Sequence, residues 1–279
     1  YVYGATISAL ATSTVSTSGV DIGGLAGAND GDVFFTVSGA NIGLKHPDAT
    51  APATGTVNIY GENSIGGEIG TAYGNTAIGG VRVSANTNIA RKGYGTVIDN
   101  ATGGLYRTAI GGVIGRTVSE TVNTLRDEIV YDGSITVNVA TSNPSDNNPT
   151  GNVGGVIGAM GEGTRFLSGS IVTVTGSIGC NLTGNYVRNF GGVVGATIEG
   201  AFDGTFTVSP KISADNAINV GGFIGRNFGT ANILSSTNGT VIKIEANITG
   251  KSQVGGLVGL NGYTYADGVV AGSLLIGAD

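Results

Sequence analysis

The chain has few of the residues that most often carry catalysis or cross-linking. Its 279 residues include no tryptophan, one cysteine (Cys180) and one histidine (His46). No internal disulfide is possible, and a histidine-based catalytic or metal site has a single ring to draw on. We therefore expect Cys180 to be a small core residue and His46, which stands beside Pro47, to be incidental.

Charge and long hydrophobic runs are also scarce. Only 11% of the residues are charged, and the net charge is −6 with no dense basic cluster, so nucleic acid is not an expected partner. No run of 18 apolar residues occurs, so no membrane-spanning helix is predicted. A hydrophobic content of 40% nevertheless argues against disorder.

Glycine, in contrast, is abundant. The chain has 52 glycines without a Gly-X-Y period, which excludes a collagen helix. Asparagine, threonine, serine, alanine and valine make up much of the rest. This composition is typical of many short strands joined by tight turns, and it predicts an all-β protein.

One phrase recurs along the chain: an apolar residue, two glycines, two apolar residues and a third glycine. Clear copies are Asn219-Val-Gly-Gly-Phe-Ile-Gly225 and Gln253-Val-Gly-Gly-Leu-Val-Gly259. A second phrase of alternating β-branched residues lies between copies, as in Gly133-Ser-Ile-Thr-Val-Asn-Val139. The second glycines of the recurring phrase are Gly24, Gly67, Gly112, Gly155, Gly192, Gly222 and Gly256.

Strands this short cannot bury a hydrophobic face alone, but stacked units, about 4.8 Å apart, bury a continuous core. The repeat therefore predicts a β-solenoid, right-handed and parallel β-helix-like, of about seven irregular coils. A sandwich or barrel explains the strands but not the recurrence. We expect an N-terminal strand or extension over residues 1–20, which docks to a neighbour or to its own chain. The repeat domain covers 21–268 and an apolar end strand 269–279.

The phrases Val220-Gly-Gly-Phe-Ile-Gly-Arg-Asn227 and Val254-Gly-Gly-Leu-Val-Gly-Leu-Asn261 resemble the GLUG repeat, with Asn238-Gly-Thr-Val241 between them. That repeat occurs in large bacterial surface and secreted proteins, including adhesins and filamentous β-helical stalks. The resemblance covers most of residues 22–261 and implies an extracellular or cell-surface protein. Glu68 departs from it, because it occupies an apolar position of the second copy.

We expect the recurring phrase to form one strand, both of whose faces are apolar. The face that carries glycine, an apolar residue and glycine then needs a cover, which is either the same chain or a neighbouring subunit. The two ends of the chain are apolar as well. We therefore name these candidate interface residues: Tyr1, Tyr3, Ile7, Val113, Val156, Val193, Phe223, Leu257, Leu274 and Ile276.

The first functional hypothesis is a structural protein that assembles with copies of itself into a filament or surface layer. A monomeric adhesin or carbohydrate-binding module is the first alternative, with surface glycans as its ligands. Its contact residues are aromatic: Tyr94, Tyr106, Tyr131, Tyr263 and Tyr265.

A polysaccharide-degrading enzyme is the second alternative, and it needs converging carboxylates. The acidic pairs Asp30/Asp32, Asp127/Glu128 and Glu199/Asp203 are scattered along the chain, so we predict no catalytic residue. No cofactor is expected except calcium, whose oxygen ligands are available at Asn29–Asp32 or Ser145–Asn148.

Two local patterns complete the predictions. Thr117-Val-Ser-Glu120 fits a helix capping box and predicts a short helix within Arg116–Asp132. Asn-X-Ser/Thr sequons mark four glycosylation candidates, which are Asn100, Asn181, Asn238 and Asn247.

Overall fold

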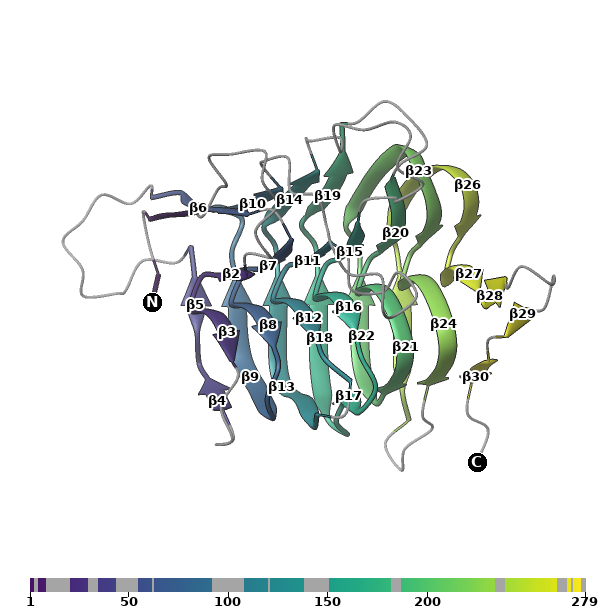
Figure 1. Cartoon of the computed structure of the whole chain (residues 1–279), viewed down its shortest axis with the longest axis horizontal. Coiled ribbons are helices and arrows are strands. Elements are labelled where there is room, and N and C mark those ends of the chain that lie inside the picture. The colour runs from purple at the N-terminus through teal and green to yellow at the C-terminus, as the bar shows by residue number, and fades with distance from the viewer. Residues whose placement is uncertain are drawn as a thin grey trace, which may run out of the picture.

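A computed structural model of the chain contains thirty strands, β1 to β30, and no helix among the residues it describes (Figure 1). The described residues are 1–2, 5–8, 21–29, 35–43, 55–61, 63–91, 108–119, 121–137, 151–181, 187–233, 239–264, 270–271 and 273–276. All strand pairs are parallel except β28 (Tyr263–Thr264) with β29 (Val270–Ala271), which form an antiparallel pair. The prediction of an all-β chain is confirmed.

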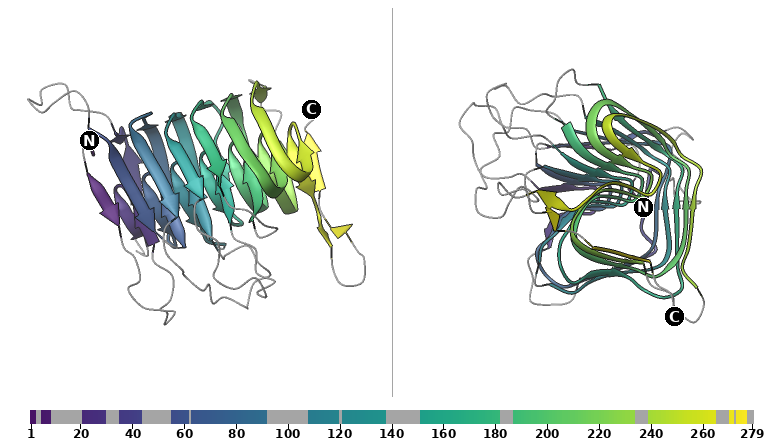
Figure 2. Two further views of the ribbon diagram at one scale, coloured as in Figure 1. Left: turned by 90° about the horizontal axis from the view of Figure 1, so that it is seen from above. Right: turned by 90° about the vertical axis from the view of Figure 1, so that its right-hand side faces the viewer.

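The strands stack in seven layers, and each layer pairs in parallel with the layers before and after it. The seven isoleucines at one ladder position show this most directly, because each is the register partner of the next. They are Ile7, Ile59, Ile89, Ile135, Ile178, Ile212 and Ile248. The layers follow one another from the N-terminal to the C-terminal end and nearly superimpose when seen along the stack (Figure 2).

Within a layer the chain passes through up to five rows of strands. The first row contains β1 (Thr6–Ser8), β6 (Val57–Gly61), β10 (Thr87–Arg91), β14 (Ser134–Val137), β19 (Ser177–Cys180) and the first parts of β23 (Lys211–Gly221) and β26 (Asn247–Gly255). The second row contains β2 (Asp21–Gly23), β7 (Ser64–Gly66), β11 (Ala109–Gly111), β15 (Asn152–Gly154), β20 (Val187–Gly191) and the second parts of β23 and β26. These two rows form one twelve-stranded sheet, since β23 pairs with both β19 and β20.

The other three rows form the second sheet. The third row contains β3 (Ala26–Asn29), β8 (Ile69–Ala72), β12 (Ile114–Thr117), β16 (Ile157–Met160), β27 (Val258–Asn261) and the first parts of β21 (Val194–Phe202) and β24 (Ile224–Ile233). The fourth contains β4 (Phe35–Ser38), β17 (Thr164–Phe166), β30 (Ser273–Ile276), the second parts of β21 and β24 and the first parts of β9 (Thr76–Val83) and β13 (Asn123–Tyr131). The fifth contains β5 (Asn41–Ile42), β18 (Ser170–Val174), β22 (Gly204–Val208), β25 (Val241–Ile244) and the second parts of β9 and β13.

The recurring phrase is a corner between the two sheets. In the third layer β11 ends at Gly111, Gly112 and Val113 form a bend, and β12 begins at Ile114. The prediction of one straight strand with two apolar faces is therefore wrong. The alternation of side chains is interrupted at the bend, so residues on either side of it point into the molecule in both sheets.

The glycines allow backbones to meet at this corner. A methyl group on Gly222 would overlap the carbonyl oxygen of Gly256 in the next layer. A methyl group on Gly225 would lie 2.6 Å from the backbone nitrogen of Phe190 in the preceding layer. The strands before and after the bend thus touch through their backbones, which explains why the phrase keeps its glycines.

Four phenylalanines fill the core beside the corner. The ring of Phe223, at the bend of the sixth layer, lies 5.0 Å from the ring of Phe202 and 5.1 Å from that of Phe206, centroid to centroid. Phe166 stacks on Phe202 at 5.5 Å. All four side chains are at most 1% exposed, so they form a continuous hydrophobic core through the fourth to sixth layers.

The expected helix within Arg116–Asp132 is absent from its described residues, so that prediction is wrong. β13 occupies Asn123–Tyr131 instead, and it pairs with β9 on one side and with β17 and β18 on the other. Leu125, Ile129 and Tyr131 are buried in the core. Their burial between two strands outweighs a local capping signal.

Candidate functional site

The acidic pairs do not form a common site among the described residues. Asp127 forms an ion pair with Arg126 at 3.7 Å, and Glu128 forms one with Arg82 at 3.2 Å. These side chains are all at least 45% exposed, so solvent screens their charges and the pairs add little stability. We therefore assign no acid–base chemistry to them.

Glu199 and Asp203, another of the acidic pairs, lie in different surroundings. Glu199 is exposed and lines a cavity of about 110 Å³ over β17, β21 and β24, with Arg165 and Asn232. Asp203 is 8% exposed and accepts a hydrogen bond from Thr240 Oγ1 at 3.4 Å. The third pair, Asp30 and Asp32, lies outside the described residues.

Cys180 is buried among the core residues of β19, as predicted. His46 and Ser145–Asn148 lie outside the described residues, as does Asn29–Asp32 apart from Asn29. In the part of the chain that the structure describes, no group of three or more histidine, cysteine, aspartate or glutamate residues is arranged to hold a metal ion.

Glu68 is the most unusual titratable residue. It stands at the bend of the second layer, at the position that Val113 occupies in the third, and it is 0% exposed. Neither carboxylate oxygen has a hydrogen-bond partner among the described residues. Burial raises the pKa of this carboxyl from 4.5 to about 8, because an apolar interior disfavours the charged form.

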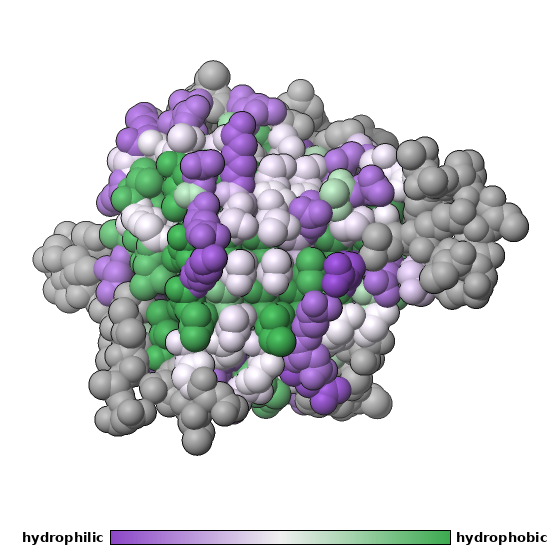
Figure 3. Space-filling model, turned by 180° about the vertical axis from the view of Figure 1, so that it is seen from behind, coloured by the Kyte–Doolittle hydropathy of each residue, from purple (hydrophilic) through white to green (hydrophobic). Residues whose placement is uncertain are grey.

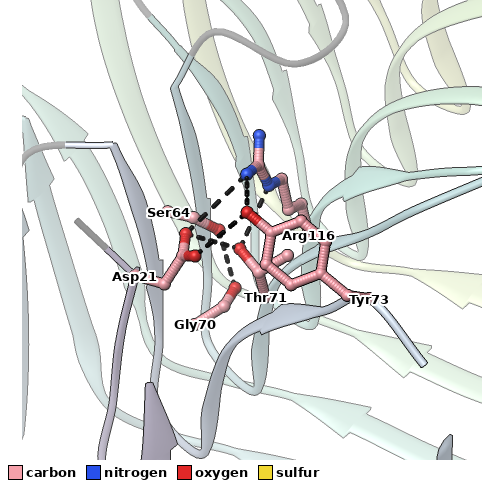
Figure 4. A network of polar contacts seen from close by, with 6 residues as sticks. All are labelled: Asp21, Ser64, Gly70, Thr71, Tyr73 and Arg116. Atoms are coloured by element: carbon pink, nitrogen blue, oxygen red, sulfur yellow. Dashed lines mark hydrogen bonds and ion pairs between the residues drawn. The ribbon is translucent and has the colours of Figure 1, made fainter. Parts of the chain in front are cut away.

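A polar cluster joins the first three layers across the corner (Figure 4). Arg116 donates from Nε to Thr71 Oγ1 at 3.0 Å and from a terminal nitrogen to the Tyr73 hydroxyl at 2.7 Å. Thr71 and Tyr73 in turn donate to the carboxylate of Asp21, at 2.7 and 3.2 Å. Ser64 donates to the carbonyl oxygen of Gly70 at 2.6 Å. Because these groups satisfy one another, the cluster fastens layers together.

A second polar ladder runs through the later layers. Asn189 Nδ2 donates to Asn152 Oδ1 and Asn219 Nδ2 donates to Asn189 Oδ1, both at 2.7 Å. All three side chains are at most 5% exposed. Asn189 and Asn219 have φ near +60°, the left-handed region that asparagine tolerates better than most residues. The residue two positions before the glycine pair is therefore asparagine in these layers for structural reasons.

Four of the candidate interface residues are inside the molecule. Val113, Val156, Val193 and Phe223 are each 0% exposed, and for Phe223 the covering side chains are Phe202 and Phe206 of the same chain. A neighbouring subunit cannot reach them, so their assignment as interface residues is corrected. The alternative of cover by the same chain describes them instead.

The other interface candidates belong to the first and last layers. Tyr1 is 60% exposed and Ile7 is half-buried in β1 of the first layer, which pairs with β6. Leu257 is half-buried at the bend of the last layer. Leu274 and Ile276 lie in β30, which pairs with β24 of its own chain. Tyr3 lies outside the described residues.

In the first three rows, the strands of both terminal layers pair on one side only among the described residues, whereas Val2 forms a parallel bridge with Ile42 of β5 in the fifth row. β1, β2 and β3 at one end, and β26 and β27 at the other, each have a single neighbouring strand within their row. Side chains there are partly uncovered: Leu25 is 50% exposed and Val254 is 47% exposed. Their counterparts in inner layers, such as Val113 and Val220, are 0% exposed.

The outer face of the fifth row is a lateral surface, and the view from behind shows polar and apolar residues interspersed (Figure 3). One ladder on this face contains Glu128, Ile171, Thr205 and Val241, and the adjacent one contains Arg82, Val130, Thr173, Thr207 and Lys243. Ile171 and Val241 are 52% and 53% exposed. These two side chains are separated by Thr205, so they do not form a continuous apolar patch.

The aromatic residues and sequons are only partly described. Tyr131 is 0% exposed, so it is a core residue and not a ligand contact, and burial raises the pKa of its hydroxyl well above the usual value. Tyr263 lies in β28, and Tyr94, Tyr106 and Tyr265 lie outside the described residues. Asn181 and Asn247 are exposed, whereas Asn100 and Asn238 lie outside the described residues.

Comparison with known proteins gives no relative: no family model, no curated protein and no solved structure matches the chain. Among the described residues there is no helix long and apolar enough to cross a membrane.

Proposed function

We propose that this chain is an extracellular or cell-surface structural protein, a β-solenoid subunit that joins copies of itself end to end. The observation that carries the proposal is the contrast between inner and terminal layers. Val220 is 0% exposed because Val254 stacks on it in the next layer, whereas Val254 itself is 47% exposed. The hydrophobic ladder thus stops at an uncovered position.

The energetics favour covering these positions. Burying a valine or leucine side chain fully is worth about 1.5–3 kcal/mol, so covering a half-exposed one recovers roughly half of that. A terminal layer carries several such residues, and it also presents unpaired backbone groups that a further parallel strand would satisfy. The first and last layers lie at opposite ends of the stack, so contact between unlike ends would add copies along one axis and produce a filament (Figure 2).

The location and the class of protein are inferred from composition and resemblance. Low charge, a single cysteine and the GLUG-like phrase fit a repetitive surface protein. In this proposal the chain has no catalytic role and needs no cofactor. A monomer that binds glycans through its loops is the outcome that would favour the adhesin alternative.

The test compares wild type with two lysine variants by sedimentation velocity and negative-stain electron microscopy. Val254→Lys places a charge on the terminal layer, and Ile171→Lys places one on the lateral face at a similarly exposed β-branched residue. We expect wild type and Ile171→Lys to form filaments or concentration-dependent oligomers, and Val254→Lys to remain monomeric. A wild-type chain that is monomeric at all concentrations would refute the proposal.

A further inference from the structure

We propose, building on the proposed self-assembly, that the partner at each end is the opposite end of a second copy, bound in one register. The last layer of one copy would lie under the first layer of the next copy. In that register the bend residue Leu257 stacks on Leu25 of the next copy. The recurring phrases of the two layers then align as they do between consecutive layers of one chain.

The ladder positions of the two terminal layers match throughout the recurring phrase. Ile248 occupies the ladder position of Ile7, so the column of isoleucines would continue into the second copy. The remaining matched pairs, last layer first, are Val254 with Ile22, Gly255 with Gly23, Gly256 with Gly24, Val258 with Ala26 and Gly259 with Gly27. Apolar residues meet apolar residues, and glycines meet glycines.

Gly256 is the observation that most needs a second copy. In an inner layer, a methyl group on the corresponding Gly222 would overlap the carbonyl oxygen of the next layer. At Gly256 no described atom lies within 4 Å of the position that a methyl group would take. Nothing described in its own chain therefore requires glycine here, whereas a first layer stacked on it would bring the Gly24 carbonyl into that space.

Side-chain amides favour the head-to-tail orientation. Asn227 Nδ2 donates to Asn261 Oδ1 at 2.7 Å, which directs the Asn261 amide toward the open end. At the other end Asn29, at the same ladder position, donates from Nδ2 to Thr76 Oγ1 at 2.9 Å, toward the second layer. In the proposed register the Asn261 amide would donate to Asn29 Oδ1 of the next copy. Two like ends would not align these ladders, because their strands would run antiparallel.

Disulfide trapping tests the register directly. Leu25 and Leu257 lie in the first and last layers, so a disulfide between cysteines at these positions joins two molecules. Stacked layers about 4.8 Å apart satisfy the Cα separation of a disulfide. In a Cys180→Ala background, we expect the Leu25→Cys/Leu257→Cys double variant to form a ladder of cross-linked oligomers on oxidation.

Each other outcome of the trapping is informative. Cross-linked dimers of a single Leu257→Cys variant would show contact between like ends and overturn the register. Assemblies that sediment normally but never cross-link in the double variant would overturn the register while the proposed self-assembly stands. A chain that never associates would overturn both.

A glycine comparison provides an independent test. Gly256→Ala should leave the circular dichroism spectrum and the unfolding midpoint of the monomer unchanged but abolish assembly. Gly179→Ala is the matched control, because a methyl group there has ordinary contacts at 3.8 Å and 4.0 Å, and it should assemble like wild type. Normal assembly of Gly256→Ala would overturn the proposed register.

Discussion

Replacing Glu68 with leucine should stabilise the protein, and the gain should grow as the pH rises. Glu68 occupies the ladder position of Leu25 and Val113, and its two carboxylate oxygens are buried without a described partner. Leucine suits the apolar interior and already occupies this position in the first layer. The substitution therefore removes a buried ionisable group without introducing a new kind of contact.

The magnitude follows from the pKa of the carboxyl, which burial raises from 4.5 to about 8. The folded state then binds the proton more tightly than the unfolded state. Below pH 4.5 the carboxyl is protonated in both states, so its ionisation does not reduce the free energy of unfolding. As the pH rises from 4.5 toward 8, the unfolded state loses this proton first, and the free energy of unfolding falls. With 1.36 kcal/mol per pKa unit, ionisation costs about 3 kcal/mol at pH 7 and about 5 kcal/mol above pH 8, as orders of magnitude.

The assay is denaturant unfolding of wild type, Glu68→Leu and Glu68→Gln between pH 4 and pH 9. We expect the difference in unfolding free energy between wild type and Glu68→Leu to increase through this range. Glu68→Gln should remove the same pH dependence while leaving a buried polar amide, so it separates ionisation from polarity. Parallel pH profiles for all three proteins would refute the assignment of a buried, protonated carboxyl.

Three further substitutions test the core, the corner and the asparagine ladder. Phe206→Ala should lower the unfolding free energy by about 3–5 kcal/mol, because it empties the centre of the phenylalanine cluster, whereas Thr205→Ala on the outer face should change it by less than about 0.5 kcal/mol. Gly222→Ala should yield little folded protein in a solubility and circular dichroism assay, because its methyl group would overlap the Gly256 carbonyl, and a normal spectrum would contradict the corner geometry. Asn189→Ala should cost about 2–4 kcal/mol from two lost hydrogen bonds and an unfavourable φ. Asn189→Gly should cost less by thermal unfolding, since it removes only the bonds, and equal losses would argue against backbone strain.

The sequence alone determined that the chain is all-β and repetitive. The recurring glycine phrase predicted units that stack, and alternating stretches such as Gly204–Val208 predicted strands of the inner layers. It also marked Cys180 as a core residue and Glu68 as a departure from the pattern, and both are buried. These features depend on local composition and on the spacing of the repeat, both of which can be determined from the sequence alone.

The corner was decided only by the tertiary structure. The apolar pattern of the recurring phrase is compatible with a straight strand and with a bend. It indicates that the side chains are buried, but it does not indicate the direction of the backbone. The same limit applied to Thr117–Glu120, where a local capping signal predicted a helix next to what is β13.

The sequence also did not predict which side chains pack over the bend residues. Phe202 and Phe206 lie in β21 and β22 of the fifth layer, and they meet Phe223, the bend residue of the sixth layer, because the two layers stack around one core. Which side chain covers which depends on these long-range contacts. The sequence therefore determined that stacked layers form. The tertiary structure decided that the bend residues of the inner layers, such as Val113 and Phe223, are buried, whereas Leu25 of the first layer is 50% exposed.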